Sequence, residues 1–286
     1  GIYHFASGNT YEGGFSKGFR HGDGSFRYGN GAQYSGQFVL GHKEGTGRFE
    51  FRGVEYEGQW AGDKFHGEGS WMNEDGDVFR GQFEDGLPSG AGRQKLMGGD
   101  SFEGVFYEGK RDGIGVYRWA SGDTYEGQFK GEIRCGEGSY RSDAGLEYVG
   151  EWDNNVPHGK GAFTRTSNEG TYSYVGQWKN GVKEGHGQYT FPSGNQYTGE
   201  FMSDVKHGSG TFLWKNECAW TGSFSRDQRH GMGVYKDLDG VEHVEHYEYN
   251  TLTERDGIPV DESGGRRDSE PTVEETPAET DQMQLP

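Results

Sequence analysis

The chain is poor in aliphatic residues and proline. Apolar residues of all kinds make up only 30% of the 286 residues, and aromatic residues account for 15% of the chain. A conventional domain of this length builds its core mostly from Leu, Ile and Val, so an ordinary two-layer core is largely excluded. Only 7 prolines occur, and the glycines follow no strict three-residue period, which excludes collagen.

Cysteine, long apolar runs and positive charge are also scarce. The two cysteines, Cys135 and Cys218, are too few for a disulfide framework and are typical of a reducing cytosol. No apolar run approaches the roughly 18 residues of a membrane span, and no signal peptide is recognisable. The net charge of -18 disfavours nucleic acid and anionic membranes as partners, because both present negative phosphate groups.

Glycine and aromatic residues are abundant, and they form a repeat. A pentad of the form aromatic-x-Gly-x-aromatic occurs ten times, mostly at intervals of 23 residues. A Gly-x-Gly follows each pentad at a fixed distance, and another aromatic residue usually follows two positions later. Regular self-similarity of this kind predicts a repeat protein. The pentads begin and end at Tyr11 and Phe15, Tyr34 and Phe38, Tyr56 and Trp60, Phe79 and Phe83, Phe102 and Phe106, Tyr125 and Phe129, Tyr148 and Trp152, Tyr174 and Trp178, Tyr197 and Phe201, and Trp220 and Phe224.

The spacing within each repeat predicts two short β-strands. The aromatics and the glycine of a pentad have the same parity, so they share one face of a strand, and the same holds for the Gly-x-Gly element. We expect the bare glycine backbone to make room for a ring of a neighbouring strand. The residue seven positions after each pentad start is Gly, Asp or Asn, except Glu132, and these types suit a tight hairpin turn. Loops are expected to absorb the length changes near Arg52–Gly53 and 166–170.

The best-matching stretch is Tyr-Glu-Gly-Gly-Phe at residues 11–15, followed by His-Gly-Asp-Gly at 21–24. These motifs resemble the MORN repeat (membrane occupation and recognition nexus), and the resemblance covers roughly residues 1–247. Departures include Ser89, Asp112 and Cys135 in place of His, and Gln94 in place of an aromatic residue. The resemblance implies an all-β fold, an elongated single-layer solenoid of successive antiparallel β-hairpins with a groove along one side.

The chain divides into an array and a tail. We expect the array to span 1–250, with a partial repeat over 1–10, ten repeats from residue 11 and a degenerate cap over about 241–250, where Glu245 replaces a glycine. Residues 251–286 are acidic and lack aromatics, which predicts a disordered C-terminal tail. Because the sequence opens within a repeat and has no initiator Met, we expect it to be a fragment or processed form of a longer protein.

The aromatic face predicts a protein-binding function. A single sheet does not cover its own apolar face, and uncovered aromatic area usually marks an interface. We therefore expect a groove that binds a helix or peptide of a partner, or a second copy of the chain as a homodimer. The alternative is that curvature and stacking of rings on glycine bury most of this area. The predicted groove residues are Tyr11, Phe15, Tyr34, Phe38, Tyr56, Trp60, Tyr125, Phe129, Tyr148, Trp152, Tyr174, Trp178, Tyr197, Phe201, Trp119 and Trp214.

No arrangement of residues predicts catalysis or a cofactor. No Ser/His/Asp or Cys/His set stands out from the repeat, so we expect the protein not to be an enzyme. The histidines that precede Gly-x-Gly are interpreted as hairpin-closing residues rather than as a metal-binding row. His243 and His246 are an incomplete candidate for a zinc site at a dimer contact, because two ligands do not complete one.

The resemblance also suggests a cellular role. MORN-only chains with many repeats resemble radial-spoke-head proteins of cilia and flagella and cytoskeletal MORN proteins of protists. This favours a cytoplasmic, non-enzymatic scaffold in the cytoskeleton or in the axoneme of a cilium or flagellum. A membrane-associated module that binds phosphoinositides or tethers membranes is the alternative, although the acidic charge counts against it. A third hypothesis is that the chain regulates an enzyme encoded elsewhere in the same gene.

Overall fold

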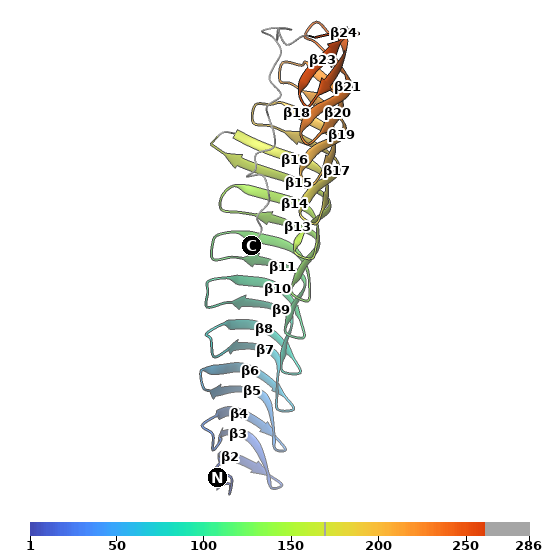
Figure 1. Ribbon diagram of the computed structural model, residues 1–286. Coiled ribbons are helices and arrows are strands. Elements are labelled where there is room, and N and C mark those ends of the chain that lie inside the picture. The colour runs from blue at the N-terminus through green and yellow to red at the C-terminus, as the bar shows by residue number, and fades with distance from the viewer. Residues whose placement is uncertain (169, 261–286) are drawn as a thin grey trace. The chain divides into compact units, whose positions relative to one another are not determined.

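The computed structural model describes residues 1–168 and 170–260. The chain forms two compact units, which we call unit 1 (Gly1–Ile133) and unit 2 (Arg134–Pro286). The described residues consist of strands, turns and connecting segments, and they contain no helix (Figure 1). The predicted all-β class is therefore confirmed.

Both units consist of short antiparallel strands joined by tight turns. The strands that begin in unit 1 are β1 (Ile2–His4), β2 (Thr10–Ser16), β3 (Phe19–Arg27), β4 (Gln33–Val39), β5 (His42–Phe51), β6 (Val54–Ala61), β7 (Lys64–Met72), β8 (Val78–Glu84), β9 (Leu87–Lys95), β10 (Ser101–Tyr107), β11 (Lys110–Arg118), β12 (Thr124–Lys130) and β13 (Ile133–Arg141), whose first residue is the last of the unit. Those of unit 2 are β14 (Leu146–Asp153), β15 (Val156–Ser167), β16 (Gly170–Lys179), β17 (Val182–Thr190), β18 (Gln196–Met202), β19 (Val205–Leu213), β20 (Ala219–Ser225), β21 (Gln228–Lys236), β22 (Glu242–Glu248), β23 (Thr251–Arg255) and β24 (Ile258–Pro259).

Within each unit, every strand pairs with its neighbours in the chain, so the predicted hairpins are confirmed. Apart from slight contacts, packing among the described strands is also confined to chain neighbours, which makes each unit a single layer. The register aligns rings with rings. Tyr34 of β4 lies opposite Phe26 of β3 and Phe49 of β5, while Gly36 lies opposite Gly24 and Gly47. We call the side that carries these aromatic residues the ring face and the opposite side the polar face.

Tyrosine rings lie across the paired glycines. A Cβ atom built on Gly36 would lie 2.5 Å from the Tyr34 hydroxyl oxygen and 2.5 Å from the Cα atom of Gly47. The Tyr34 ring therefore covers a glycine of its own strand as well as one of the neighbouring strand. The sequence pattern predicted only the second of these. No side chain larger than hydrogen fits at either glycine while the ring keeps its position.

The second ring of each pentad closes the core between repeats. Phe38 contacts Tyr11 of the preceding repeat at 5.2 Å and Tyr34 of its own repeat at 5.1 Å, both edge to face. Trp60 repeats this arrangement with Tyr34 and Tyr56, at 4.9 and 5.3 Å. Each such pair contributes about 0.5–1.5 kcal/mol beyond the burial of the rings. The rings therefore form a continuous core along each unit, although no second layer of strands lies over it in the described residues.

The tyrosine hydroxyl has a structural role as well. The Tyr34 hydroxyl donates a hydrogen bond to the Gln37 carbonyl oxygen at 3.0 Å, and Tyr56 donates to Gln59 at 2.6 Å. The acceptor lies where the register shifts at a β-bulge, so the carbonyl group needs a partner outside the strand ladder. This hydrogen bond explains why Tyr is the commonest first residue of the pentad.

All ten hairpin turns contain the predicted left-handed residue. The φ angle seven positions after the pentad start is positive in every repeat, for example 84° at Gly18 and 67° at Asp63. It is also positive at Glu132, with a φ of 81°, although the residue type did not predict this. Its carboxylate accepts a hydrogen bond of 2.7 Å from the Arg111 amide, which stabilises the turn.

Two sequence-based boundaries are wrong. The length change expected in a loop at 166–170 instead lengthens β15 and β16, whose pairing extends to Ser167 and Gly170. The tail was expected to begin at residue 251, but β23 and β24 continue the strand pairing through Pro259. These two strands carry no aromatic residue, so the repeat pattern gave no sign of them. The rest of the predicted tail, from 261 to 286, lies outside the described residues.

Candidate functional site

Most of the predicted groove rings belong to the core. Of the sixteen, only Phe15 is exposed, at 46%, and Trp119 is half-buried. Phe15 is exposed because β1 is only three residues long and stops short of it. The others are at most 5% exposed, because the next repeat and the glycine backbone enclose them, so a partner cannot reach them. The buried ones are Tyr11, Tyr34, Phe38, Tyr56, Trp60, Tyr125, Phe129, Tyr148, Trp152, Tyr174, Trp178, Tyr197, Phe201 and Trp214.

We call the aromatic residues that follow Gly-x-Gly the flanking rings. Of the four in unit 1, Phe49, Trp71 and Tyr117 are half-buried, whereas Phe26 is only 5% exposed. Phe49 lies between Tyr34 and Tyr56 in the register, and Trp71 lies between Tyr56 and Phe79. Both flanking rings are half-buried, whereas their tyrosine neighbours are completely buried. Other half-buried rings extend the same surface, namely Tyr28, Phe51, Tyr117 and Trp119.

A row of cations accompanies these rings. Nine positions after the pentad start, seven of the ten repeats carry Arg or Lys. In unit 1, the Lys43 Nζ atom lies 4.7 Å from the ring centre of Trp60 and 5.5 Å from that of Phe49. Arg20 lies over Phe26 at 4.8 Å and Arg111 over Tyr117 at 4.8 Å, and both are half-buried. The sequence carries a signal for this row, the recurring basic residue, which lies outside the aromatic and glycine pattern. The row consists of Arg20, Lys43, Arg111, Arg134, Lys183, Lys206 and Arg229.

The turn of the next repeat fixes the backbone of each cation. The amide of Lys43 donates to Asp63 Oδ1 at 2.9 Å, and the Lys43 carbonyl oxygen accepts from the Asp63 amide at 3.2 Å. Asn155 holds Arg134 in the same way. Where the cation position is occupied by Pro88, which has no N–H group, the turn residue is Gly109. Beside Lys43, Arg111, Lys183 and Lys206 the turn residue is acidic and partly balances the charge of the cation.

The two units differ in how far the ring face is buried. Phe49 and Trp71 are half-buried in unit 1, whereas Phe163, Tyr189 and Phe212, the equivalent flanking rings of unit 2, are 0% exposed. Three of the four cations of unit 2 are also more buried, since Lys43 is half-buried but Lys183 and Lys206 are 1% and Arg134 is 7% exposed, whereas Arg229 is half-buried.

The carboxylates beside the cations show the same contrast. Partial burial raises the pKa of Asp63, but hydrogen bonds from the Lys43 amide and His42 outweigh it and leave the pKa below its usual value. In unit 2, burial raises the pKa of Asp227 above its usual value, despite the hydrogen bond from the Lys206 amide and the charges of Lys206 and Lys183. The ring face of unit 2 is therefore the less hydrated of the two.

The repeat matches a known family along most of its length. The family model described as MORN repeat matches residues 11–33, 34–53, 56–78, 79–101, 102–124, 125–146, 148–169, 174–196, 197–219 and 220–241. The chain belongs to the MORN-repeat family. The matched segments begin at the first aromatic residue of the pentads, so each MORN repeat corresponds to one pentad strand and the Gly-x-Gly strand that follows it.

Comparisons with other proteins add little to this assignment. No curated protein matches the MORN chain. Among solved structures, the TCP10 domain of Danio rerio CPAP in complex with a STIL peptide is 10% identical, with a TM-score of 0.27 over 84% of this chain and 95% of that chain. The TCP domain of Drosophila melanogaster SAS-4 in complex with a proline-rich motif of Ana2 is 13% identical, with a TM-score of 0.25 over 63% and 84%. Scores this low carry no argument about function.

The polar face of the MORN array has a different chemistry. In unit 1 a shallow hollow over β7 to β10 is lined by the backbone of the glycine row and by charged side chains such as Arg80 and Arg93. Arg93 forms an exposed ion pair of 2.7 Å with Glu103. Val105 and Ile114 are exposed on this face, at 41% and 68%. These residues provide a site for control substitutions, because they lie away from the rings.

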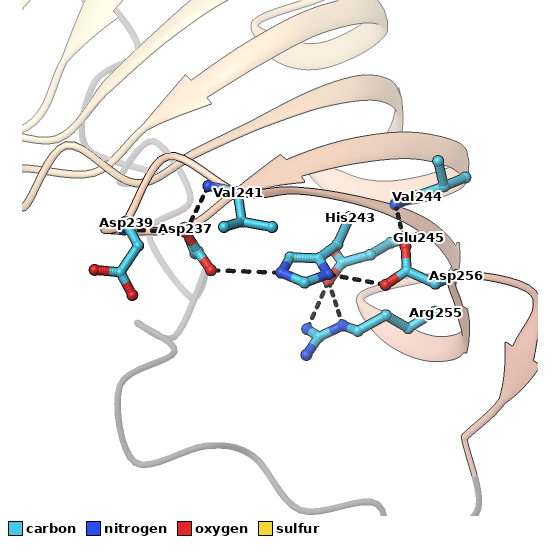
Figure 2. Close-up of polar contacts among 8 residues, drawn as sticks. All are labelled: Asp237, Asp239, Val241, His243, Val244, Glu245, Arg255 and Asp256. Carbon is cyan, nitrogen blue, oxygen red and sulfur yellow. Dashed lines mark hydrogen bonds and ion pairs between the residues drawn. The ribbon is translucent and has the colours of Figure 1, made fainter.

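A polar cluster follows the last complete MORN repeat (Figure 2). His243 Nδ1 lies 2.9 Å from Asp256 and its Nε2 lies 3.4 Å from Asp237, so both nitrogens face a carboxylate. Since a carboxylate only accepts hydrogen bonds, this geometry favours the protonated imidazole. The hydrogen bond to Asp256, followed by that to Asp237, raises the pKa of His243. Next to this cluster, Arg255 makes two hydrogen bonds to Glu245, which is completely buried in place of the glycine of earlier repeats.

The histidines and cysteines of the array do not assemble a metal site. His246 Nδ1 pairs with Thr253 at 2.7 Å, away from the partners of His243, so the structure does not bring the two imidazoles of the incomplete zinc candidate to a common partner. Over residues 1–168 and 170–260, no group of three or more His, Cys, Asp or Glu residues could hold a metal ion. Cys218 is a buried free thiol, and Cys135 is half-buried. The same described residues include no helix with the length and apolar character that a bilayer crossing requires.

Proposed function

We propose that this MORN-repeat protein is a non-enzymatic scaffold whose ring face in unit 1 binds a helix or extended peptide of a partner protein. The observation that carries the proposal is the combination of half-buried flanking rings with half-buried cations, lying over a core that is already complete. Aromatic residues and Arg are enriched at protein interfaces. The pentad rings hold this surface in place and do not themselves contact the partner.

The chemistry of the surface selects the kind of partner. Lys43 and Arg20 favour acidic side chains, while Phe49 and Trp71 favour apolar ones. We therefore expect the bound segment to carry both kinds of side chain. We further propose that the scaffold acts in the cytoskeleton or in the axoneme of a cilium or flagellum, which rests on the resemblance to MORN-only chains of those structures.

Substitution of the flanking rings tests the proposal. The full chain, immobilised, should retain a defined set of proteins from extracts of its native cells, and Phe49→Ala combined with Trp71→Ala should lower the retained amount at least about tenfold. The double substitution removes apolar area from the surface and leaves the buried pentad rings unchanged. Quantitative mass spectrometry of the retained proteins is the measurement.

Substitutions on the polar face provide the control. Val105→Ala combined with Ile114→Ala removes apolar area from exposed positions that face away from the rings. This variant should retain the same proteins as the original chain. The proposal is wrong if the variant with Phe49→Ala and Trp71→Ala retains its partners in undiminished amount. It is also wrong if this variant and the control variant lose their partners equally while their circular dichroism spectra stay unchanged. Loss of self-association in the ring-face variant alone, measured by sedimentation, would identify the partner as a second copy.

A further inference from the structure

The accessible side chains on the ring face of unit 1 recur at every second strand. Seven residues that are paired across neighbouring strands form a continuous line, which we call the cross-strand row. In order of pairing, the row consists of Phe49, Tyr56, Trp71, Phe79, Gln94, Phe102 and Tyr117. Its second, fourth and sixth members are at most 2% exposed, whereas the other four are half-buried. A ligand that lies across the strands therefore meets one accessible side chain at every second strand.

This interval selects the conformation of the ligand. Neighbouring strands lie about 4.8 Å apart, so the accessible members of the row lie about 9.6 Å apart. A polyproline II helix has three residues per turn and rises about 3.1 Å per residue, so it presents every third residue on the same side at about 9.3 Å. An α-helix makes about 1.8 turns over the same distance, and a β-strand points its third residue to the opposite side. Both of these fall out of step with the row.

The side chains of the row suit proline. Three of the four accessible members are the aromatic residues Phe49, Trp71 and Tyr117, and proline-rich segments dock into grooves that are lined by aromatic rings. The fourth is Gln94, whose amide group donates hydrogen bonds of the kind that the free carbonyl groups of a polyproline II backbone accept. Since proline fixes its own backbone before binding, such a segment loses little conformational freedom on the row.

The charge beside the row distinguishes its two ends. At one end, the Lys43 Nζ atom lies 5.5 Å from the ring centre of Phe49. The Asp63 carboxylate beside it accepts a hydrogen bond of 2.9 Å from the Lys43 amide rather than from the ammonium group. At the other end, the Arg111 guanidinium already forms an ion pair with Glu132. An acidic side chain of the ligand is therefore favoured at the Lys43 end.

We propose that the cross-strand row binds a proline-rich segment of the partner protein in the polyproline II conformation. The segment runs across the strands, with a proline at every third position over the aromatic members of the row and an acidic residue next to Lys43. Gln94 donates a hydrogen bond to a carbonyl oxygen of the segment. This assignment rests on the proposed function of the ring face, and it names the kind of segment that the ring face takes.

Binding of synthetic peptides to the full chain tests the proposal. The probe is a fluorescent peptide of two glutamates followed by ten prolines, which make about three turns and match the length of the row. It should bind at least about tenfold more tightly than a peptide with ten alanines in place of the prolines, whose backbone is not fixed. A peptide with two lysines in place of the glutamates should bind at least about threefold more weakly than the probe. Fluorescence anisotropy at physiological salt measures all three affinities.

Variants of the row supply the matched controls. Trp71→Ala should weaken binding of the probe at least about tenfold, whereas Trp71→Phe should weaken it less than about threefold. Gln94→Tyr completes the series of rings and should tighten binding at least about threefold, a gain that misfolding does not produce. Lys43→Gln should abolish the difference between the glutamate and lysine peptides, whereas Lys43→Arg should keep it. Val105→Ala combined with Ile114→Ala, on the polar face, should leave binding unchanged.

Three results would overturn the proposal. They are equal affinity for the proline and alanine peptides, undiminished binding of the probe by the Trp71→Ala variant, and no gain in the Gln94→Tyr variant. The retention experiment on Phe49 and Trp71 uses the natural partners, so it can succeed while the proline probe fails. That combination would reject polyproline II as the bound conformation and leave the proposed function intact.

Discussion

At the residue scale, each repeat depends on a glycine pair under a ring. The rings that cover these pairs are buried because the bare backbone lies beneath them and the second pentad ring of the next repeat makes an edge-to-face contact with them. Burial of one Phe-sized side chain contributes about 1.5–3 kcal/mol. Burial also raises the pKa of Tyr56 to about 12, so the phenol stays neutral and donates its hydrogen bond to Gln59.

Gly36→Ala tests this arrangement. The new methyl group would lie 2.5 Å from the Tyr34 hydroxyl, the Gly47 Cα atom and the Thr46 carbonyl oxygen, so either the ring or a strand must move. We expect a loss of about 1–3 kcal/mol in the free energy of unfolding, measured by chemical denaturation. Gly98→Ala is the matched control, because no atom lies within 4 Å of the new methyl group, and it should leave stability nearly unchanged. Equal stability of the two variants would contradict the arrangement.

The sequence predicted which face carries the rings, but it did not predict which rings remain accessible. Parity placed Tyr34 and Phe49 on the same face, and the structure confirms this. Tyr34 is buried because two rings contact it. Phe38 comes from the same repeat as Tyr34, and Trp60 comes from the next repeat. That packing involves contacts between repeats, and a pattern read within one repeat does not contain it.

At the scale of the element, the hairpin turns combine backbone geometry with side-chain hydrogen bonds. Asp63 and Asn155 adopt a positive φ and also accept a hydrogen bond from the amide at the cation position of the preceding repeat. The turn residues were predictable, because few residue types suit a left-handed backbone. The strands β23 and β24 were not predictable from the sequence, because they carry no aromatic residue and are held by polar contacts such as that of Arg255 with Glu245.

The polar cluster of His243 predicts that the C-terminal hairpin of β22 and β23 depends on pH. The pKa of His243 is raised, so its stabilising contribution is fully present below about pH 6.5 and is lost as the pH rises through the folded value. The pKa of Asp256 is lowered by its hydrogen bond to His243, so its contribution is lost only as the pH falls below about 4. The hairpin should therefore be more stable at about pH 5.5 than at about pH 8.5.

Hydrogen exchange measures this dependence. The Val244 amide, which donates to Asp256 at 2.9 Å, should be more protected at the lower pH after correction for the intrinsic exchange rate. His243→Gln should remove the dependence, whereas His246→Gln should keep it because His246 faces Thr253. Equal protection of Val244 at both values of pH in the unaltered chain would count against an ion pair at His243.

At the scale of the whole chain, one repeat pattern produces two units with the same construction and different surfaces. The MORN repeats supply a core that is completed within the sheet, so the flanking rings are left for other contacts. In unit 1 three of the four flanking rings are half-buried, and in unit 2 all of them are buried. Sequence patterns predicted the repeat and its fold, but the difference between the units lies in side-chain burial, which the repeat does not encode.

Hydroxyl-radical footprinting of the full chain tests the division between core rings and surface rings most directly. After normalisation to intrinsic reactivity, Phe49 and Trp71 should be modified at least about tenfold faster than Tyr56 and Trp60, because the latter are at most 4% exposed. Mass spectrometry of the labelled peptides gives the rate at each ring. Modification of Tyr56 and Trp60 at the same rate as Phe49 and Trp71 would contradict the division.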